Sequence, residues 1–496
     1  MKHTQRFLAA ILALTLGGTI CACGEAAPTD DTTAGTDTET TTPETTAKTY
    51  IPDLPEKDFE GRELKILVWE RSTEPMITDF CVEEETGDAL DDAVYRRNRA
   101  IEDRYNVELV LDQVARGQLP SIFNRALMAS EYNWDIVDAQ LSDINTMTLR
   151  GFLYDLNSLD YLDFSKEWWD TRYAEQMSIA GRLYSILGDI NLFDDCNTWS
   201  VIYNKDLAAS FQINDLYDRA FAGTWTLDYM YELAQMASSD LDGDGDMDEK
   251  DRWGLLSATT DLYFHFLGAG ESVAGKNSED LPELTLNTER GVNVLEKAHT
   301  MMNDASSVWI NEKWTHLTTG SLTREINCPM FMDNRVLLQI AAVEYGYTRY
   351  RDMTNEFGML PMPKYDEKQE EYYNGVSPYW ATALSIPVTC PDPDFPAFMM
   401  EALAAESVLT MTQTFNNVVL QGKALRDEES MEIMMLIKNS RTYDIGYLND
   451  WGGMQNFLRQ ILDTKPLQFS SAYASRESSI LNAMNTTIAK YQEISQ

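Results

Sequence analysis

Twelve residues near the middle of the chain, DLDGDGDMDEKD (residues 240–251), carry an acid at nearly every second position. Carboxylates this close together repel one another unless a cation neutralises them. Their spacing matches the calcium-binding loop of an EF-hand, with Gly245 at the position where that loop turns sharply. The expected ligand residues are Asp240, Asp242, Asp244, Asp246 (through its backbone carbonyl), Asp248 and Asp251. The pattern therefore predicts one bound Ca²⁺ ion.

The elements around this loop favour a structural role for the ion. The stretch TWTLDYMYELAQMAS (224–238) predicts an amphipathic helix capped by threonine, and RWGLLS (252–257) predicts a strand. Sensor EF-hands occur in pairs, whereas this loop occurs once. We therefore expect the ion to hold the preceding helix and the following strand together. Asp251 stands where an EF-hand usually has glutamate, which leaves the affinity and the ligand number open. The alternative is a solvated acidic turn.

Candidate binding residues are placed by the elements that precede them. Strand-like runs such as LKILVW, VELVL, DIVDA, VLLQIAAV and ALSIPV alternate with longer helical patterns. This alternation predicts an α/β fold. Polar and aromatic side chains at the carboxyl ends of such strands commonly form a ligand site.

A series of longer stretches resembles, in its order, the family 1 extracellular solute-binding lipoproteins of ABC importers, which have a type II periplasmic-binding-protein-like fold. GRELKILVWE (61–70), YNVELVLDQV (105–114) and NWDIVDAQ (133–140) look like the first three strands of that family. GFLYDLNSLDYLDFSKEWWD (151–170) is similar to its double-tryptophan segment. Three later stretches also resemble parts of that family: its first crossing segment in GRLYSILGDINLFDDCNTWSVIYNKDLAASF (181–211), its return strand in FGMLPMPKYDEKQEEYY (357–373) and its second crossing in SPYWATALSIPVTCPDPDFPAFMMEALAA (377–405).

The resemblance implies an α/β architecture of two lobes with an interlobe cleft and chain crossovers. We expect the chain to cross twice, so that each lobe is discontinuous. The first lobe would comprise residues 51–190 and 328–375, and the second would comprise 191–327 and 376–496, with the calcium-type loop 240–251 in the second. The ligand would lie in the crevice between the lobes.

The resemblance also implies a carbohydrate ligand, which aromatic rings and polar side chains would hold. The candidates at strand ends and crossings are Trp69, Glu70, Gln140, Asp143, Asp189, Asn191, Trp199, Glu344, Tyr345, Tyr379 and Trp380. Each has a simpler alternative, since an aromatic residue at a strand end often packs in the core and an acid is often only solvated. For Trp168 and Trp169 we favour packing.

The first residues predict export. Lys2, His3 and Arg6 precede the apolar run FLAAILALTLGG, which is too short for a stable membrane span. The following ICACG resembles a bacterial lipobox, so residues 1–22 are expected to be a lipoprotein signal peptide and Cys23 the lipidated residue; an ordinary secretory signal is the alternative. Residues 23–50 contain almost no large apolar side chain until their last position and predict a disordered tether.

The composition of the chain argues against some classes of binding partner and of active site. The formal net charge of −41 over 496 residues argues against nucleic acid or anionic lipid as a partner of the folded part. Cys81, Cys196, Cys328 and Cys390 lie far apart without a CxxC pair, which argues against a metal cluster and leaves their disulfide state open. The four histidines form no HExxH motif, and no GxSxG elbow is present.

These observations predict a monomeric solute-binding protein, not an enzyme. It would be lipid-anchored on the outer face of the cell membrane, capture a sugar or oligosaccharide, and deliver it to the permease subunits of an ABC importer. Two alternatives stay open. One is a secreted carbohydrate-active hydrolase, because 80 acids always offer some pair at catalytic distance. The other is a surface protein for adhesion or sensing.

Overall fold

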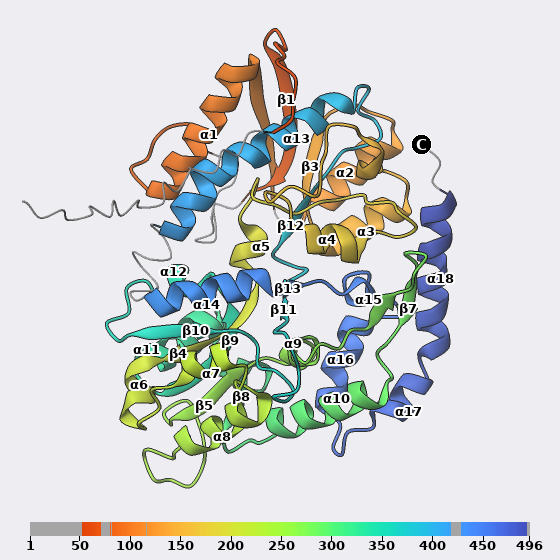
Figure 1. Ribbon diagram of the computed structural model, residues 1–496. Helices are drawn as coiled ribbons and strands as arrows, with labels where there is room; N and C mark the ends of the chain where they lie inside the picture. Colours follow the sequence, from red (N-terminus) through yellow and green to blue (C-terminus); the bar gives the residue numbers. More distant parts are fainter. Residues whose placement is uncertain (1–51, 71–79, 81, 116, 418–427, 494–496) are drawn as a thin grey trace, which may run out of the picture. The chain divides into compact units, whose positions relative to one another are not determined.

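The computed structural model describes residues 52–70, 80, 82–115, 117–417 and 428–493 (Figure 1). The expected signal peptide, Cys23, the tether and Cys81 lie outside these residues. Tyr50–Gln496 form one compact unit. Within the described residues, no helix combines the length and the apolar character that crossing a membrane requires.

Two mixed β-sheets form the framework. The first has the order β12-β3-β1-β2, in which β1 is parallel to β2 and β3 and antiparallel β12 pairs with β3. Its strands are β1 (Arg62–Trp69), β2 (Val107–Val114), β3 (Ile136–Gln140) and β12 (Thr382–Ser385). The second sheet has the order β10-β4-β9-β5-β8. Its strands are β4 (Trp199–Asn204), β5 (Trp253–Ser257), β8 (Val308–Ile310), β9 (Val336–Ala342) and β10 (Phe357–Leu360).

Two further pairs of short strands lie outside these sheets. The hairpin of β6 (Ala274–Lys276) and β7 (Pro282–Leu284) is antiparallel. The parallel ribbon of β11 (Asn374–Gly375) and β13 (Arg441–Thr442) joins two segments that are far apart in the chain.

Helices connect the strands, as the alternating pattern predicts. The helices before the second sheet are α1 (Ala89–Tyr105), α2 (Leu119–Met128), α3 (Leu141–Leu149), α4 (Thr171–Met177) and α5 (Phe193–Cys196). Those between β4 and β12 are α6 (Lys205–Ser210), α7 (Leu216–Ala222), α8 (Leu227–Ala237), α9 (Asp261–Gly268), α10 (Glu289–Met302), α11 (Cys328–Met332) and α12 (Tyr345–Thr348). The last are α13 (Asp394–Ser407), α14 (Glu428–Asn439), α15 (Ile445–Leu448), α16 (Met454–Leu462), α17 (Phe469–Ala474) and α18 (Glu477–Glu493).

Local sequence explains where several elements begin and end. The Thr226 hydroxyl accepts the Tyr229 N–H and caps α8, and β5 follows the acidic loop, as the sequence predicts. Asp88 caps α1, and Asn106 ends that helix in the left-handed conformation (φ 51°). The strands of both sheets are largely apolar runs, in keeping with helices on both faces.

The return of the chain between the sheets differs from the prediction. Segment 328–375, expected in the first lobe, contains β9 and β10, which pair with β4 and β5 in the second sheet. Segment 376–496, expected in the second lobe, contains β12, which pairs with β3 in the first sheet. The error arose because hydrophobic pattern identifies a strand but does not identify its partner in the sheet.

The chain passes between the sheets three times, not twice. The first crossing leads from Ile186, which bridges to Leu384 of β12, to β4. The second leads from β10 to β12. The third follows α13, which packs against α1, and precedes α14, which packs against β10. Thr198 bridges to Val376, which joins the first crossing to the second, and β11 pairs with β13, which joins the second crossing to the strand that follows α14.

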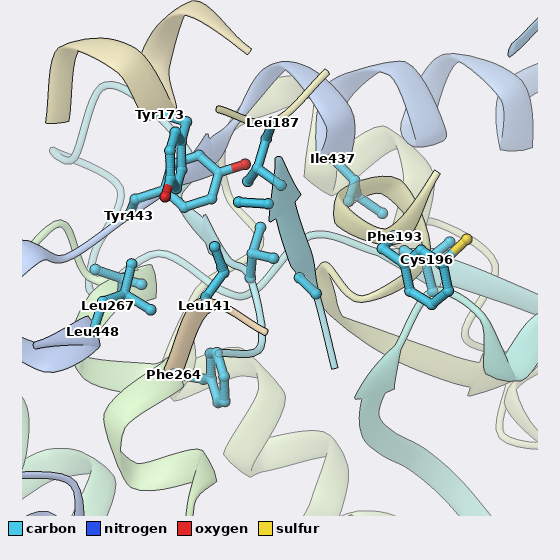
Figure 2. Close-up of a cluster of buried hydrophobic side chains, with 14 of the residues drawn as sticks. Leu141, Tyr173, Leu187, Phe193, Cys196, Phe264, Leu267, Ile437, Tyr443 and Leu448 are labelled. Atoms are coloured by element: carbon cyan, nitrogen blue, oxygen red, sulfur yellow. The ribbon is translucent and has the colours of Figure 1, made fainter. Parts of the chain in front are cut away.

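One apolar core runs through these crossings. Figure 2 shows Phe193 from the first crossing and Ile437 from α14, which follows the third crossing, and Leu267 lies on α9. Tyr173 and Tyr443 meet edge to face there, with ring centroids 5.0 Å apart. The described residues of the first two crossings therefore take part in this core and are not loose linkers.

Candidate functional site

The first sheet brings four predicted residues to one edge. β1 ends at Trp69 and β3 ends at Gln140, while Thr382, the first residue of antiparallel β12, lies opposite Gln140. Tyr379 and Trp380, which directly precede β12, therefore lie at the same edge. The Gln140 side-chain amide donates a hydrogen bond to the Tyr379 carbonyl. Both tyrosine and tryptophan rings are half-buried there.

The second sheet presents a corresponding edge. Trp199, the first residue of β4, lies opposite Ala342, the last residue of β9. Glu344 and Tyr345 follow directly after β9, and the Glu344 backbone N–H donates to the Cys196 carbonyl at 2.9 Å. Seven of the predicted residues therefore fall into two sets, one at the carboxyl edge of the parallel strands of each sheet.

Trp199 is held in place by two contacts. Its ring stacks on Phe264 of α9, with centroids 4.6 Å apart and an interplanar angle of 13°. Its indole N–H donates to Asp261 Oδ1 at 3.0 Å. Asp261 also accepts from the Ser257 hydroxyl at 3.0 Å and the Ala258 N–H at 2.7 Å. Burial raises the pKa of this carboxyl to about 7. Sequence reasoning missed Asp261 and Phe264, although Asp261 stands four residues beyond the end of β5.

Three predicted residues have positions that fit packing or charge pairing better than direct ligand contact. Trp69 is only 3% exposed and lies against Phe193, so it does not fit the expected stacking platform. Asn191 is fully buried, and its side-chain oxygen accepts the Phe193 N–H. Asp189 lies 3.4 Å from Lys438.

The other acids and tryptophans lie as follows. Glu70 is exposed beyond β1, and burial raises the pKa of Asp143 on α3. Trp168 and Trp169 are buried and donate their indole N–H groups to Glu401, at 3.1 and 2.8 Å. The packing role that we favoured for these two tryptophans is confirmed.

A buried cluster of charges ties the crossings together. Arg441 of β13 contacts Asp194 at 2.6 Å, Asp195 at 3.0 Å and Asp170 at 3.3 Å. Lys438 at the end of α14 contacts Asp195 at 3.1 Å, as well as Asp189. We call these six residues the crossing cluster. Sequence reasoning identified only Asp189 of this set.

The crossing cluster holds four carboxylates against two cations, and its adjacent acids Asp194 and Asp195 influence each other's ionisation. Burial and the neighbouring Asp195 raise the pKa of Asp194, against the effect of Arg441. Burial also acts on Asp195, but Lys438 and Arg441 lower its pKa overall. The pKa of Asp194 is thus raised and that of its neighbour Asp195 is lowered, although the two acids are adjacent in the chain.

We expect stability to fall as pH rises from 5 to 8. Burial raises the pKa of Asp261 to about 7, of Glu401 to about 7 and of Asp444 to about 6, above their unfolded values near 4. Between about pH 4 and 7 the folded protein therefore binds more protons than the unfolded chain, which gives the free energy of unfolding a negative slope against pH. Urea unfolding at pH 5 and pH 8 measures the difference, expected to be a few kcal/mol.

The Asp261→Asn variant serves as the control for this pH dependence, because it removes one of the titrating groups. Its free energy of unfolding should fall less steeply between pH 5 and 8 than that of the wild type. A wild-type protein that becomes more stable over this range would contradict the assignment of raised pKa values to the buried acids.

The acidic loop brings three of its six aspartates together. Carboxylate oxygens of Asp240, Asp242 and Asp244 lie within 4.8 Å of one another. Ca²⁺–oxygen distances of about 2.4 Å allow two ligands on opposite sides of an ion to stand about 4.8 Å apart, so this spacing fits one ion. Asp240 also accepts the backbone N–H groups of Gly243 and Gly245, at 2.6 and 2.9 Å.

The remaining acids of the loop have other partners in this structure. Asp251 is fully buried and accepts the backbone N–H groups of Leu241 and Asp248, each at 2.8 Å. Asp248 lies 2.9 Å from the ammonium group of Lys250. Asp251 thereby closes the loop through backbone hydrogen bonds.

The described cysteines are buried side chains. Cys196, Cys328 and Cys390 are all buried, and no disulfide joins any two of these three. Cys328 lies 3.6 Å from the Tyr350 hydroxyl, and Cys390 lies 3.6 Å from Asp135. Burial raises the pKa of the Cys390 thiol to about 12, which keeps it protonated.

Comparison by sequence finds no relative: no family model matches the chain, and no curated protein matches it. Comparison by structure finds many similar solved proteins. The galacto-N-biose/lacto-N-biose I-binding protein of a Bifidobacterium longum ABC transporter, solved with lacto-N-biose, has a TM-score of 0.58 at 10% identity. The match covers 87% of this chain and 99% of that one.

Two further structures agree. An ABC substrate-binding protein from Listeria monocytogenes, in complex with cycloalternan, has a TM-score of 0.54 at 11% identity over 87% of this chain and 99% of its own. A cyclo/maltodextrin-binding protein complexed with maltotetraose has a TM-score of 0.54 at 15% identity over 88% and 100%. The chain therefore has the two-lobed α/β fold of ABC-transporter solute-binding proteins, as the resemblance implied.

Proposed function

We propose that the protein captures a small solute, a sugar or an oligosaccharide, for an ABC importer. The observation that carries this proposal is that each of the two sheets places aromatic and polar side chains at the carboxyl edge of its parallel strands. Gln140, Tyr379 and Trp380 lie at the edge of the first sheet, and Trp199 and Glu344 lie at the edge of the second. Indole and phenol rings pack against the apolar faces of a sugar, while amide and carboxylate groups bind its hydroxyls. The neighbours of the same fold include proteins solved with oligosaccharides.

Capture would act through closure of the two lobes. A solute that contacts residues of both edges favours the closed arrangement over the open one, because it gains contacts only there. The closed form would then be the one that the permease subunits recognise. The protein works in this scheme as a monomeric binding protein that releases its ligand unchanged.

The proposed location follows from the first residues of the chain. A signal peptide over residues 1–22, lipid on Cys23 and a tether over 23–50 would hold the folded unit on the outer face of the cell membrane. The Cys23→Ala variant should then fail to incorporate labelled fatty acid and should leave the membrane fraction.

A thermal-unfolding screen tests the proposed function. The protein is heated with mono- and oligosaccharides, amino acids or short peptides, and a ligand that binds the folded state raises the Tm by mass action. We expect one sugar class to raise it and to be recovered chemically unchanged. Conversion of the sugar to products would support a hydrolase instead, and a folded protein that responds to no sugar would contradict the proposal.

We also propose that the acidic loop binds one Ca²⁺ ion as a structural element between α8 and β5. Calcium at about 100 times its Kd should add about 2.7 kcal/mol to the free energy of unfolding. Removal by a chelator should reverse the gain. The Asp244→Asn variant should lose most of this response, because it neutralises one of the three clustered carboxylates.

Asp246→Asn is the matched control for the calcium site. It removes the same charge from the same loop, but Asp246 is expected to bind the ion through its backbone carbonyl, which the substitution keeps. Its response to calcium should stay close to that of the wild type. If both variants respond equally, general charge reduction and not ligation explains the effect of calcium.

A further inference from the structure

Arg459 of α16 carries a positive charge beside the edge of the first sheet. Its guanidinium carbon lies 5.8 Å from the centroid of the Tyr379 ring. Gln455 stands one turn earlier on the same helix and accepts a hydrogen bond from the Tyr379 hydroxyl. Residues four apart lie on the same face of a helix, so this face of α16 is turned toward Tyr379. Arg459 is therefore a neighbour of one residue of the proposed solute site.

Contacts that do not involve Arg459 hold this face of α16 in place. The Gln455 side-chain amide donates to the Tyr447 carbonyl at 2.9 Å, and its backbone N–H donates to Asp450 Oδ1 at 2.8 Å. The helix also packs against α9 (Figure 1). Gln455 thus fixes the Tyr379 hydroxyl without help from the guanidinium group of Arg459.

The guanidinium group of Arg459 has donors that the described part of the chain does not use. Among the described residues, none forms a hydrogen bond or an ion pair with it, and its buried Nε atom has no acceptor. Buried polar groups normally have a partner, and this chain has 80 acidic residues against 39 lysines and arginines. An arginine without an acid is therefore exceptional here, and its donors are available to a ligand.

Two acids act electrostatically on the same tyrosine as Arg459. Asp450 and Asp444 both influence Tyr447, as Arg459 does. Burial raises the pKa of Asp450 overall, although Arg459 lowers it, which agrees with the lack of an ion pair between these two described residues. Asp444 is buried and accepts four backbone N–H groups. Neither acid occupies the donors of Arg459.

The chemistry of the guanidinium group indicates its partner. It stays charged at every physiological pH, and its planar set of N–H groups binds a carboxylate through two parallel hydrogen bonds. We propose that Arg459 recognises a carboxylate on the solute, so that the protein captures a sugar acid, alone or within an oligosaccharide. This inference rests on the proposed function, because Tyr379 belongs to the proposed solute site. The carboxylate would take the unused donors of Arg459, while the aromatic rings of the sheet edges pack against the sugar.

Three variants test the role of the guanidinium group. Arg459→Met removes it and keeps the apolar length of the side chain. Arg459→Lys keeps the charge but lacks the planar pair of donors. Arg476→Met is the matched control, because Arg476 is also half-buried, lies 5.1 Å from the centroid of the Phe457 ring and donates to Gln460 at 3.3 Å. It removes the same charge from an arginine whose ring contact is not with Tyr379.

Isothermal titration calorimetry compares acids with their uncharged counterparts. The probes are D-glucuronate, D-galacturonate and trigalacturonate, the methyl ester of each, D-glucose 6-phosphate, and the neutral sugars D-glucose and maltotriose. We expect at least one acid to bind the wild type more tightly than its methyl ester does. Arg459→Met should weaken binding of that acid by at least about 10-fold and leave the Kd of the ester nearly unchanged. Arg459→Lys should lie between these two proteins, and Arg476→Met should match the wild type.

Four results would overturn this inference and leave the proposed function intact. The first is a wild type that binds a neutral sugar but no acid more tightly than its ester. The second is an Arg459→Met variant that loses as much affinity for the ester as for the acid. The third is an equal loss in Arg476→Met, which would indicate overall charge as the cause. The fourth is a preference for D-glucose 6-phosphate over every carboxylate.

Failure of the proposed function itself gives a different result. A wild type that is folded, as verified by its thermal transition, but binds neither acidic nor neutral sugars in the calorimeter or in the thermal screen would contradict both proposals. Binding of a neutral sugar that Arg459→Met does not affect would contradict only the carboxylate site.

Discussion

Replacing Arg441 with methionine is expected to lower the free energy of unfolding by about 3–5 kcal/mol. The side chain is 9% exposed and contacts Asp194, Asp195 and Asp170, which are 2%, 8% and 5% exposed. Methionine keeps the apolar length of the side chain but leaves these carboxylates buried with Lys438 as their only remaining cation in the crossing cluster. Urea unfolding measures the loss.

Two further variants test whether Arg441→Met lowers stability because it leaves buried carboxylates without their cation. Lys166→Met removes the cation of an exposed pair, 3.2 Å from Asp163, and should cost only about 0–1 kcal/mol. The double variant Arg441→Met/Asp194→Asn should be more stable than Arg441→Met alone, because it removes one carboxylate that the first change leaves without its cation. If Arg441→Met costs no more than Lys166→Met, the crossing cluster does not hold the crossings together.

The position of the crossing cluster bears on the lobe closure that we propose. It joins the N-cap of α4, the segment around α5 and the strand β13, which belong to the first and third crossings or border them. If the lobes close around a solute, we expect these paired segments to act together as the hinge, while each lobe keeps its own sheet.

The sequence alone predicted an element correctly where the residues that specify the element lie close to it in the chain. The apolar run LKILVW predicted β1, and the threonine cap and helical period predicted α8. Both signals lie within a few residues of the element that they specify. The order of such stretches also carried the resemblance to solute-binding proteins, and the structural comparison confirmed the fold.

Sequence failed where the answer depends on contacts between distant residues. β9 and β12 were recognised as strands but assigned to the wrong lobes, because either sheet accepts an apolar strand. Arg441 was missed because its partners Asp194 and Asp195 lie nearly 250 residues earlier. Trp69 was predicted as a ligand-binding candidate because it ends a strand, and it is only 3% exposed and lies against Phe193, in a crossing that no local pattern places beside it.

Trp199→Ala is expected to weaken binding of the sugar identified by the thermal screen by about 2 kcal/mol, which is roughly 30-fold in Kd. Trp199 is half-buried at the edge of the second sheet, and Phe264 and Asp261 hold its ring in one orientation before any ligand binds. A ring fixed in this way loses little conformational freedom on binding, so more of its contact energy is retained. Calorimetric titration measures the change.

Trp168→Ala is the matched control, because it removes an indole of the same size from a buried position where the indole N–H binds Glu401. It should lower the Tm without changing the Kd for the sugar. Trp380→Ala should weaken binding as Trp199→Ala does, since Trp380 lies at the edge of the first sheet and a solute that closes the lobes must contact both edges. Loss of affinity in only one of the two edge variants would place the sugar on one lobe and remove the basis for closure, and wild-type affinity in both would place the solute away from the sheet edges.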